Sequence, residues 1–535
     1  MMEPQTVNSA SDKKIKVLLE MRPALDGFAG IPQEVRLLFR GLTLLDSVEI
    51  EGVLQSSHSR LANGIKDPSW WASWLNKTTT AARRYNRFAK VIISLDDKPR
   101  RSKLDVGLNY CKKHWEILAL QMSTLLGLGT IKLTRFESKS FEDFTWRSLF
   151  AKTLPASDFA SVAFANHRVC SVPWKSLHSV GLGTFKWRKT PKYAKIDSKG
   201  YDVFIGQTPY PARVGATTAM VIRYHDAIPV FMPHTISDKS LHQSSHFNAL
   251  LSNVKSGAWF ACVSEATRQD LLRLFPEAAS KAVTIHNMIS HNYFLEDSPA
   301  DRVAGIIRVR LHGEMDSKHE KTAGKPISLI PKLGSAADKD KFYTRALKQE
   351  NFKYLLIVST IEPRKNHVRL LAAWELIKAE IDPDLKLVVV GDLGWDYSKI
   401  VQDFSSWIDR GELFMLNAVP AADLRILYKH AAATICPSLG EGFDFSGVES
   451  MACGGITIAS DIPVHREVYD QAAEYFDPYA TMSLVNALKK VLYEPQAAQL
   501  QAHMRQRGEE VSSRYLPAKI LPQWNQLLQR VVTAI

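Results

Sequence analysis

The segment KIKVLLEMRPALDGFAGIPQEVRLLFRGLTLLDSVEIEGVL, residues 14–54, decides the fold class. A first apolar strand, KIKVLLE, leads into a loop in which Gly27 and Gly30 flank two further residues. An amphipathic helix follows this loop, and VEIEGVL is a second strand. The order of strand, glycine loop, helix and strand is typical of the opening of a doubly wound α/β domain.

The same alternation resumes twice further along the chain. YDVFIG, AMVIRYHDAIPV, WFACVSEATRQDLLRLFP and AVTIHNMI continue the first series, and a second series starts with YLLIVST at residue 354. Short apolar runs of this kind suit strands that are covered on both faces. We therefore predict an α/β fold with two doubly wound Rossmann-like domains facing a central cleft, where ligands bind at the carboxyl ends of the strands.

Length and composition set the predicted domain boundaries. A chain of 535 residues is long enough for more than one core. We expect a disordered polar head at 1–13, an N-terminal domain at 14–295, a charged linker at 296–350, a C-terminal domain at 351–514 and a C-terminal helix at 515–535.

The protein is expected to be cytoplasmic. The N-terminus lacks the apolar core of a signal peptide, and no run of 18 apolar residues is present. The nearest candidate, EILALQMSTLLGLGTIKL at 116–133, contains polar residues and glycines and is interpreted as a buried helix. Five cysteines without a CxxC pair fit a reducing compartment and argue against a zinc site.

Residues 56–200 form an unusual basic region. They contain 26 Lys and Arg against 10 Asp and Glu, whereas the whole chain has a net charge of only +13. Aromatic residues are interleaved in WWASWLNK, ARRYNRFAK, CKKHWE and FKWRKTPKYAK. The region departs from the strand–helix rhythm, so we interpret it as an insertion in the N-terminal domain. It is either a solvated basic surface or a face for an anionic membrane surface or a phosphate-bearing acceptor, and no nucleic acid is expected because no recognised binding module is present.

The loop STIEPRKNH, residues 359–367, carries a candidate phosphate site. A strand ends there, Pro363 turns the chain, and Arg364 and Lys365 stand just before the next helix. A helix N-terminus attracts anions through its free N–H groups and its dipole. The two cations make this loop a candidate site for a diphosphate, with a solvated helix start as the alternative.

Two carboxylates, Glu441 and Glu449, stand eight positions apart in EGFDFSGVESMACGGITIASD, residues 441–461. If 446–453 is helical, they are more than about 10 Å apart. A glycosidase pair needs about 5–9.5 Å, which makes hydrolysis by this pair an unfavourable interpretation. Separate contacts to one long ligand fit the spacing better.

These motifs resemble those of glycosyltransferase family 4, whose members are retaining enzymes with the GT-B fold. EGFDFSGVESMACGG is similar to the signature of that family, and STIEPRKNH is similar to its diphosphate loop. RYHDAIPVFMP resembles its His-Asp loop, and PALDGFAGI resembles its N-terminal glycine loop. The resemblance covers about 15–55 and 200–535 and does not extend over the basic region.

The resemblance implies roles for individual residues. Arg364 and Lys365 would neutralise the donor diphosphate, and Glu441 would contact the hydroxyls of the donor sugar. Glu449 would hold the ribose hydroxyls. The remaining candidates would lie around the reacting sugar (His225 and Asp226), along the sugar and phosphate (Phe443, Asp444, Phe445 and Ser446), and where the first domain approaches the ligand (Gly27 and Gly30).

The resemblance implies a metal-independent, retaining glycosyltransferase with a nucleotide-diphospho-sugar as co-substrate and no other cofactor. The EPRKN loop and SDIPVHREV lean toward mannosyltransferases of bacterial surface polysaccharide, with GDP-mannose as donor and a saccharide or lipid-linked acceptor. Such an enzyme would be cytoplasmic or peripheral on the cytoplasmic membrane face. The alternatives are a non-catalytic polyanion- or nucleotide-binding protein on the same scaffold, and an epimerase or phosphorylase.

Overall fold

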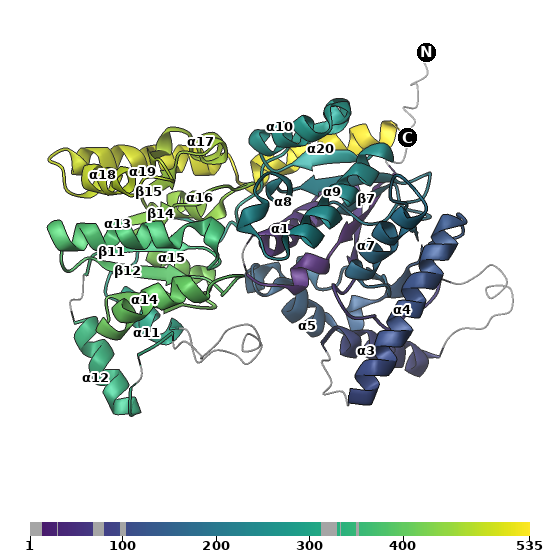
Figure 1. The fold of residues 1–535 in the computed structure, drawn as a ribbon, viewed down its shortest axis with the longest axis horizontal. Helices are drawn as coiled ribbons and strands as arrows, with labels where there is room; N and C mark the ends of the chain where they lie inside the picture. Colours follow the sequence, from purple (N-terminus) through teal and green to yellow (C-terminus); the bar gives the residue numbers. More distant parts are fainter. Residues whose placement is uncertain are drawn as a thin grey trace, which may run out of the picture.

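The computed structural model places the chain in two α/β domains that lie side by side (Figure 1). The structure describes residues 13–28, 30–67, 80–96, 103–311, 329–331, 333–348 and 352–534. Most of the predicted head, the WWASWLNK cluster and part of the predicted linker lie outside the described residues.

The first domain is built on a sheet with the order β10-β9-β8-β7-β1-β2-β5-β4. All neighbouring strands are parallel except β4, which runs antiparallel to β5. The strands are β1 (Ile15–Glu20), β2 (Val48–Leu54), β4 (Thr134–Phe136), β5 (His167–Val169), β7 (Val203–Gly206), β8 (Ala219–Tyr224), β9 (Trp259–Cys262) and β10 (Ala282–Thr284).

The second domain has a fully parallel sheet with the order β13-β12-β11-β14-β15-β16. The strands are β11 (Tyr354–Val358), β12 (Lys386–Val390), β13 (Leu413–Leu416), β14 (Ala433–Cys436), β15 (Thr457–Ser460) and β16 (Ala473–Phe476). Their residues are almost all buried, as expected for parallel strands covered by helices on both faces. Both domains therefore have the predicted doubly wound architecture.

Helices cover both sheets. The first domain contains α1 (Ile31–Thr43), α3 (Ala81–Asp96), α4 (Lys103–Leu125), α5 (Glu142–Thr145), α6 (Phe159–Val162), α7 (Trp174–Gly183), α8 (Ile228–Phe231), α9 (Lys239–Lys255) and α10 (Glu265–Leu274). The second contains α11 (Arg302–Arg310), α12 (Ala336–Ala346), α13 (His367–Glu380), α14 (Ser398–Arg410), α15 (Ala421–His430), α16 (Phe445–Ala452), α17 (Pro463–Tyr469), α18 (Thr481–Leu492) and α19 (Ala497–Ser513).

The basic region at 56–200 contributes to the main sheet of the first domain. Its two strands β4 and β5 extend the main sheet of the first domain next to β2. A separate two-stranded sheet, β3 (Thr130–Lys132) and β6 (Lys195–Asp197), connects its beginning to its end. These strands have only three residues each, too few to show a hydrophobic period in the sequence.

The predicted linker at 296–350 differs from the structure. Its described residues include α11 and α12, which bury Val303, Ile307 and Tyr343 against β11, β12 and β13. The high proportion of charged residues concealed a small apolar stripe on each helix. This part of the chain therefore belongs to the second domain.

The C-terminal helix α20 (Pro517–Thr533) returns to the first domain. Figure 1 shows it in yellow among the teal and purple elements of that domain. Trp524 is fully buried there, and the guanidinium of Arg223 lies 5.2 Å from its ring. The chain therefore passes between the domains twice, near residues 290 and 515, and this double connection sits beside the site described below.

Candidate active site

A cavity of about 390 Å³ lies between the two domains at the carboxyl ends of both sheets. Its volume falls within the range of about 300–1,000 Å³ that is usual for small-molecule sites. All the predicted site residues line it except Gly27: Gly30, His225, Asp226, Arg364, Lys365, Glu441, Phe443, Asp444, Phe445, Ser446 and Glu449. Their individual roles remain predictions.

The two glycines of the first loop differ in position. Gly30 adopts a φ of +70°, which a residue with a side chain rarely adopts, and no atom would contact a Cβ built there. Gly27 does not line the cavity and instead faces Asp392, whose carboxylate lies 3.8 Å from the position of a Cβ. Gly30 alone of the pair is therefore placed to let a ligand approach the backbone.

Glu441 bridges the two cations of the predicted diphosphate loop. Its carboxylate accepts hydrogen bonds from Arg364 Nη1 at 2.8 Å and Lys365 Nζ at 2.5 Å. Burial alone would raise the pKa of Glu441, but the charges of Arg364 and Lys365 outweigh it and hold that pKa below its usual value. Glu441, Arg364 and Lys365 thus form one ion cluster.

Two further carboxylates surround Arg364. Glu362 accepts from Arg364 Nη2 at 2.8 Å, and Asp226 from the first domain lies close enough for its pKa to be affected by the guanidinium charge. Burial raises the pKa of both carboxyls, and Arg364 partly offsets that effect. Arg364 is therefore the central cation of a buried site that both domains build.

The loop before α13 is fixed by its own side chains. Residues Pro363–Lys365 form one 3-10 turn, and Asn366 then adopts a φ of +59° to start α13. The side-chain amide of Asn366 donates to the carbonyl oxygens of Pro437 and Pro478, at 3.1 and 3.0 Å. The turn thus holds both cations toward the cavity, as the motif predicted.

Glu449 lies on α16, away from the cation cluster. Its carboxylate accepts from Gln33 Nε2 on α1 at 2.6 Å and from the hydroxyl of Tyr428 at 3.1 Å. Burial raises its pKa to about 8, although these hydrogen bonds act in the opposite direction. Glu441 and Glu449 have separate partners, which agrees with the interpretation of separate contacts to one ligand.

His225 follows β8 and is buried. Burial, with the nearby Arg223 charge, lowers its pKa to about 3, so the imidazole is neutral at physiological pH. Its Nε2 atom lies in the part of the chain that the structure describes and has no hydrogen-bond partner there. A neutral ring with a free nitrogen is suited to hydrogen bonding a sugar hydroxyl rather than to donating a proton.

Asp444 shapes the loop before α16. One carboxylate oxygen accepts from Ser446 N at 3.0 Å and from Ser446 Oγ at 2.7 Å, which caps α16, and the other lies 3.3 Å from His465 Nε2. Gly447 lies against the ring of Tyr469, and a Cβ there would be 2.3 Å from that ring. The tyrosine occupies the space that a larger residue at 447 would fill.

Several residues of the cavity were not predicted from the sequence. Gln33, Thr208, His242, His246, Asn287 and Trp395 also line it. Side-chain atoms of Gln207 and Thr208, next to His225, are buried without a partner among the described residues. Of the two, Thr208 lines the cavity, so its unpartnered hydroxyl is available to a ligand or water. The positions of these residues depend on which strands become neighbours, and no local motif reveals this.

The two domains close on each other around the cavity. The carboxylate of Glu467 on α17 accepts from the backbone N–H groups of Glu265 and Ala266 at the start of α10, at 2.6 and 2.9 Å. Trp395 Nε1 donates to the carbonyl of Thr235 at 2.8 Å. The cavity is thus an interdomain site in a closed arrangement.

Among the described residues, no group of three or more His, Cys, Asp or Glu side chains is arranged to hold a metal ion. Within the same ranges, every helix is too short or too polar to cross a membrane.

Comparison with known proteins identifies the second domain. Residues 338–511 match the family described as Glycosyl transferases group 1. The matched segment contains the cation cluster, the Asp444 loop and Glu449.

The curated proteins that this chain resembles include two from Escherichia coli. It is 28% identical over 243 residues to the serotype-specific mannosyltransferase WbdA of Escherichia coli, covering 45% of this chain and 27% of that protein. It is 26% identical over 241 residues to the O-antigen chain mannosyltransferase B of Escherichia coli, covering 45% and 51%. The chain thus spans about a quarter to a half of the length of these relatives.

The solved structures include one with similarity along the whole chain. Sucrose-phosphate synthase from Thermosynechococcus elongatus superposes with a TM-score of 0.55 at 13% identity, covering 98% of this chain and 100% of that one. At this identity the likeness concerns the fold. The arrangement of two Rossmann-like domains is therefore that of the GT-B glycosyltransferases.

Proposed function

We propose that this protein is a retaining glycosyltransferase that moves a hexose, mannose from GDP-mannose, to a saccharide or lipid-linked acceptor in bacterial surface polysaccharide synthesis. The observation that carries the proposal is the buried cluster of Arg364, Lys365 and Glu441 within the glycosyl transferases group 1 domain. The two Escherichia coli relatives are named as mannosyltransferases, which supports the choice of mannose.

In the proposed reaction, the diphosphate of the donor binds Arg364 and Lys365. Its oxygens replace the carboxylate of Glu441 at one or both cations, which frees Glu441 for the hydroxyls of the donor sugar. The cations then stabilise the charge that develops on the departing diphosphate as an oxocarbenium-like centre forms. This step uses protein cations and no metal.

The first domain supplies the other side of the reacting sugar. His225 is neutral and its Nε2 is free within the described structure, so it hydrogen bonds a hydroxyl of the donor or the acceptor. Gln207 and Thr208 provide further unpartnered polar atoms next to it. Closure by the Glu467 and Trp395 contacts excludes water and so limits hydrolysis of the donor.

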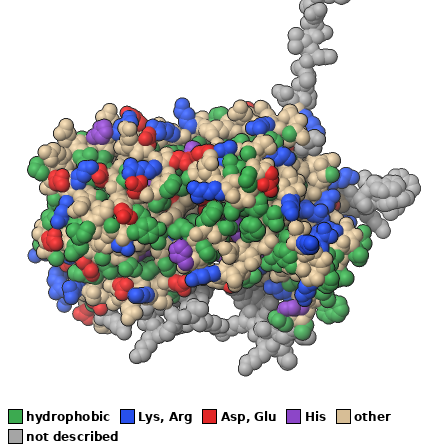
Figure 2. Space-filling model, turned by 45° about the horizontal axis from the view of Figure 1, so that its top comes forward, with side chains coloured by type: hydrophobic (Ala, Val, Ile, Leu, Met, Phe, Trp, Pro, Cys, Tyr) green, Lys and Arg blue, Asp and Glu red, His purple; other side chains and the backbone are tan. Residues whose placement is uncertain are grey.

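The protein is proposed to act in the cytoplasm, at the membrane face. Lys and Arg side chains gather at the first-domain end of the surface in Figure 2. An anionic membrane surface is thus a proposed partner, with binding that weakens as salt concentration rises.

A thermal-shift panel tests the donor site. GDP, UDP, dTDP and ADP are added in EDTA to the parent, to Lys365→Ala, to Glu449→Ala and to Lys399→Ala as an exposed control. A ligand that binds only the folded state raises the melting temperature. We expect GDP to stabilise the parent and the control but neither site variant. Stabilisation by heparin and by no nucleotide would favour a polyanion-binding protein instead.

A further inference from the structure

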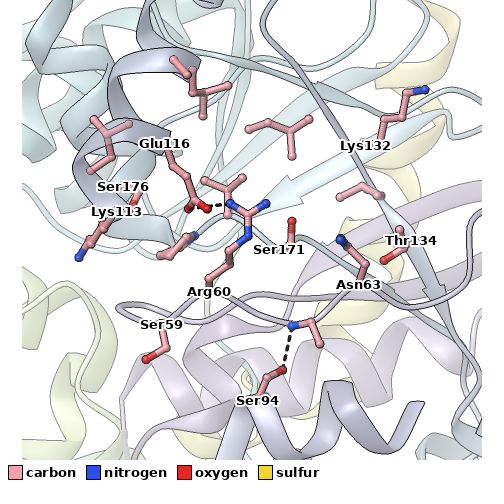
Figure 3. A pocket seen from close by; sticks show the side chains of 18 of the residues that line it. Ser59, Arg60, Asn63, Ser94, Lys113, Glu116, Lys132, Thr134, Ser171 and Ser176 are labelled. Atoms are coloured by element: carbon pink, nitrogen blue, oxygen red, sulfur yellow. Dashed lines mark hydrogen bonds and ion pairs between the residues drawn. The ribbon is translucent and has the colours of Figure 1, made fainter. Parts of the chain in front are cut away.

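A second and larger cavity, of about 1450 Å³, lies within the first domain. Its walls are the loop 58–67 after β2, the segment 171–176 after β5, and parts of α3, α4 and β3 (Figure 3). It shares no lining residue with the interdomain cavity. The basic region therefore builds a cavity of its own.

Both cavities lie at the same edge of one sheet. The interdomain cavity is lined by residues after β1, β7 and β8, and the second cavity by residues after β2 and β5. The strand order β7-β1-β2-β5 makes these positions neighbours, and strands lie about 4.8 Å apart. The two cavities therefore lie after neighbouring strands at one sheet edge.

The side chain of Gln55 connects the walls of the two cavities through hydrogen bonds. Gln55, directly after β2, donates to the carbonyl of Val172 in the second cavity at 2.8 Å. Its side-chain oxygen accepts from the hydroxyl of Tyr210 at 2.8 Å, and Tyr210 follows Pro209 of the interdomain cavity. The relative positions of the cavities are thus fixed by buried contacts.

The lining of the second cavity has an excess of positive charge. Its acids are Asp67, Glu116 and Asp197, and Glu116 is paired with Arg60 at 2.8 Å (Figure 3). Its other cations are Lys66, Lys90, Lys112, Lys113 and Lys132. None of these five lysine side chains has a hydrogen bond or ion pair to another residue that the structure describes. The cavity is consequently suited to an anion such as a phosphate.

An exposed apolar stripe on α4 adjoins the cavity. Trp115, Leu118 and Met122 are 71%, 44% and 45% exposed, and their spacing places them on one face of the helix. The sequence predicted a buried helix here, and the structure leaves this face without cover from the described residues. Ala119, which lines the cavity, lies four residues after Trp115 and three before Met122.

We infer that the second cavity binds the phosphate-bearing end of an amphipathic acceptor, a saccharide phosphate joined to a lipid chain. Lys112 and Lys113 contact the phosphate, the stripe on α4 contacts the apolar chain, and the saccharide runs along the sheet edge to the interdomain cavity. This inference rests on the proposed glycosyltransferase function, because it names the class of the acceptor.

Binding of small probes to the full chain tests the inference. Dodecyl phosphate carries both features, glucose 1-phosphate lacks the apolar chain, and dodecyl maltoside lacks the phosphate. We expect dodecyl phosphate to bind most tightly by calorimetry below its micelle concentration. The double variant Lys112→Glu/Lys113→Glu should weaken the binding of both phosphates by about tenfold or more, since it replaces two positive charges with negative ones. Lys255→Glu, an exposed lysine outside the cavity, is the matched control.

A second variant separates the two sources of phosphate. Trp115→Ser/Leu118→Ser should weaken dodecyl phosphate and leave glucose 1-phosphate unchanged, as expected for a lipid-linked acceptor. If both phosphates bind equally well to this variant and the parent, the acceptor is a soluble sugar phosphate and the lipid part of the inference fails.

Two outcomes would overturn the inference altogether. One is equal binding of dodecyl maltoside and dodecyl phosphate with no effect of the lysine substitutions. The other is binding of phosphatidylglycerol vesicles without binding of any monomeric probe, which indicates surface adsorption. Stabilisation by GDP is measured in parallel on every variant. Because the lysines lie outside the interdomain cavity, their substitution should leave stabilisation by GDP unchanged. If GDP does not stabilise even the parent, the proposed function fails, independently of the second cavity.

Discussion

Gln33 Nε2 lies 2.6 Å from a carboxylate oxygen of Glu449 and donates a hydrogen bond to it across the domain interface. Both side chains are buried, and Tyr428 donates to the other oxygen at 3.1 Å. Burial and the nearby Asp444 charge raise the pKa of Glu449, which reaches about 8. One carboxyl group therefore couples α1 of the first domain to α16 of the second and carries a proton at neutral pH.

The raised pKa predicts how stability changes with pH. The unfolded chain loses the proton of Glu449 near the ordinary pKa of 4.5, whereas the folded protein keeps it up to about pH 8. The free energy of unfolding therefore falls as pH rises through this window. Glu449→Gln should remove this decrease in stability, because glutamine does not titrate. The urea midpoint of the variant should therefore rise relative to that of the parent from about pH 5 to about pH 9.

The exposed Glu494→Gln variant is the control for this experiment, since it should follow the parent at every pH. A difference between Glu449→Gln and the parent that is the same at both pH extremes would contradict the raised pKa.

A neutral His225 predicts a specific kinetic result. Because its pKa is about 3, the ring does not titrate between about pH 5 and 8. His225→Ala should lower kcat about a hundredfold through a lost hydrogen bond to the reacting sugar, without changing the shape of the pH–rate profile over this range. Initial rates of sugar transfer measure both. His225→Asn retains a hydrogen-bonding group and should recover part of the rate. If a limb of the pH–rate profile near pH 6.5 disappeared in His225→Ala, His225 would instead have a proton-transfer role.

The sequence predicted the parts of the site that depend on local motifs. The loop with Arg364 and Lys365 and the loop before Glu449 each combine a strand end with a helix start, so a few adjacent residues determine their geometry. Gln33 and Thr208 could not be predicted in this way. Their place in the cavity depends on the neighbour relations of β1, β7 and β8, which arise from packing of the whole sheet.

The short strands within 56–200 and the helices within 296–350 were missed for a different reason. Three-residue strands such as β5 contribute too few positions for a period to be visible, and their pairing partner β2 lies more than a hundred residues away. In α12, a buried Tyr343 stands among many charged residues, so composition suggested a linker. Both omissions arise where tertiary contacts outweigh local sequence preference.

The buried ion pair of Glu34 and Arg223 predicts an effect on the stability of the fold. Glu34 accepts from Arg223 Nε at 2.8 Å, and both side chains are almost fully buried beneath Trp524. Glu34→Gln leaves the guanidinium without its counter-charge, which should cost about 3–5 kcal/mol in the free energy of unfolding. Chemical denaturation measures this change. The exposed Glu277→Gln should cost less than about 0.5 kcal/mol.

Substitutions of Gly440 and Gly442, at the domain interface, test whether closure of the two domains is required for activity. A Cβ on Gly442 would lie 1.6 Å from the carbonyl oxygen of His225, a backbone atom of the other domain. A Cβ on Gly440 would meet only the flexible end of the Met232 side chain, with Sδ at 2.7 Å and Cε at 3.6 Å. Gly442→Ala should therefore hold the domains apart, while Gly440→Ala should be accommodated by a change in the Met232 rotamer.

The comparison of these two variants separates closure from folding. We expect Gly442→Ala to keep its cooperative unfolding, to show a larger radius of gyration by small-angle X-ray scattering, and to lose about a hundredfold or more in kcat because His225 and the Arg364 cluster no longer face one sugar. Gly440→Ala should match the parent in radius and retain most of its activity. Equal activity of the two variants would mean that the close approach of Gly442 to His225 is not required for the reaction.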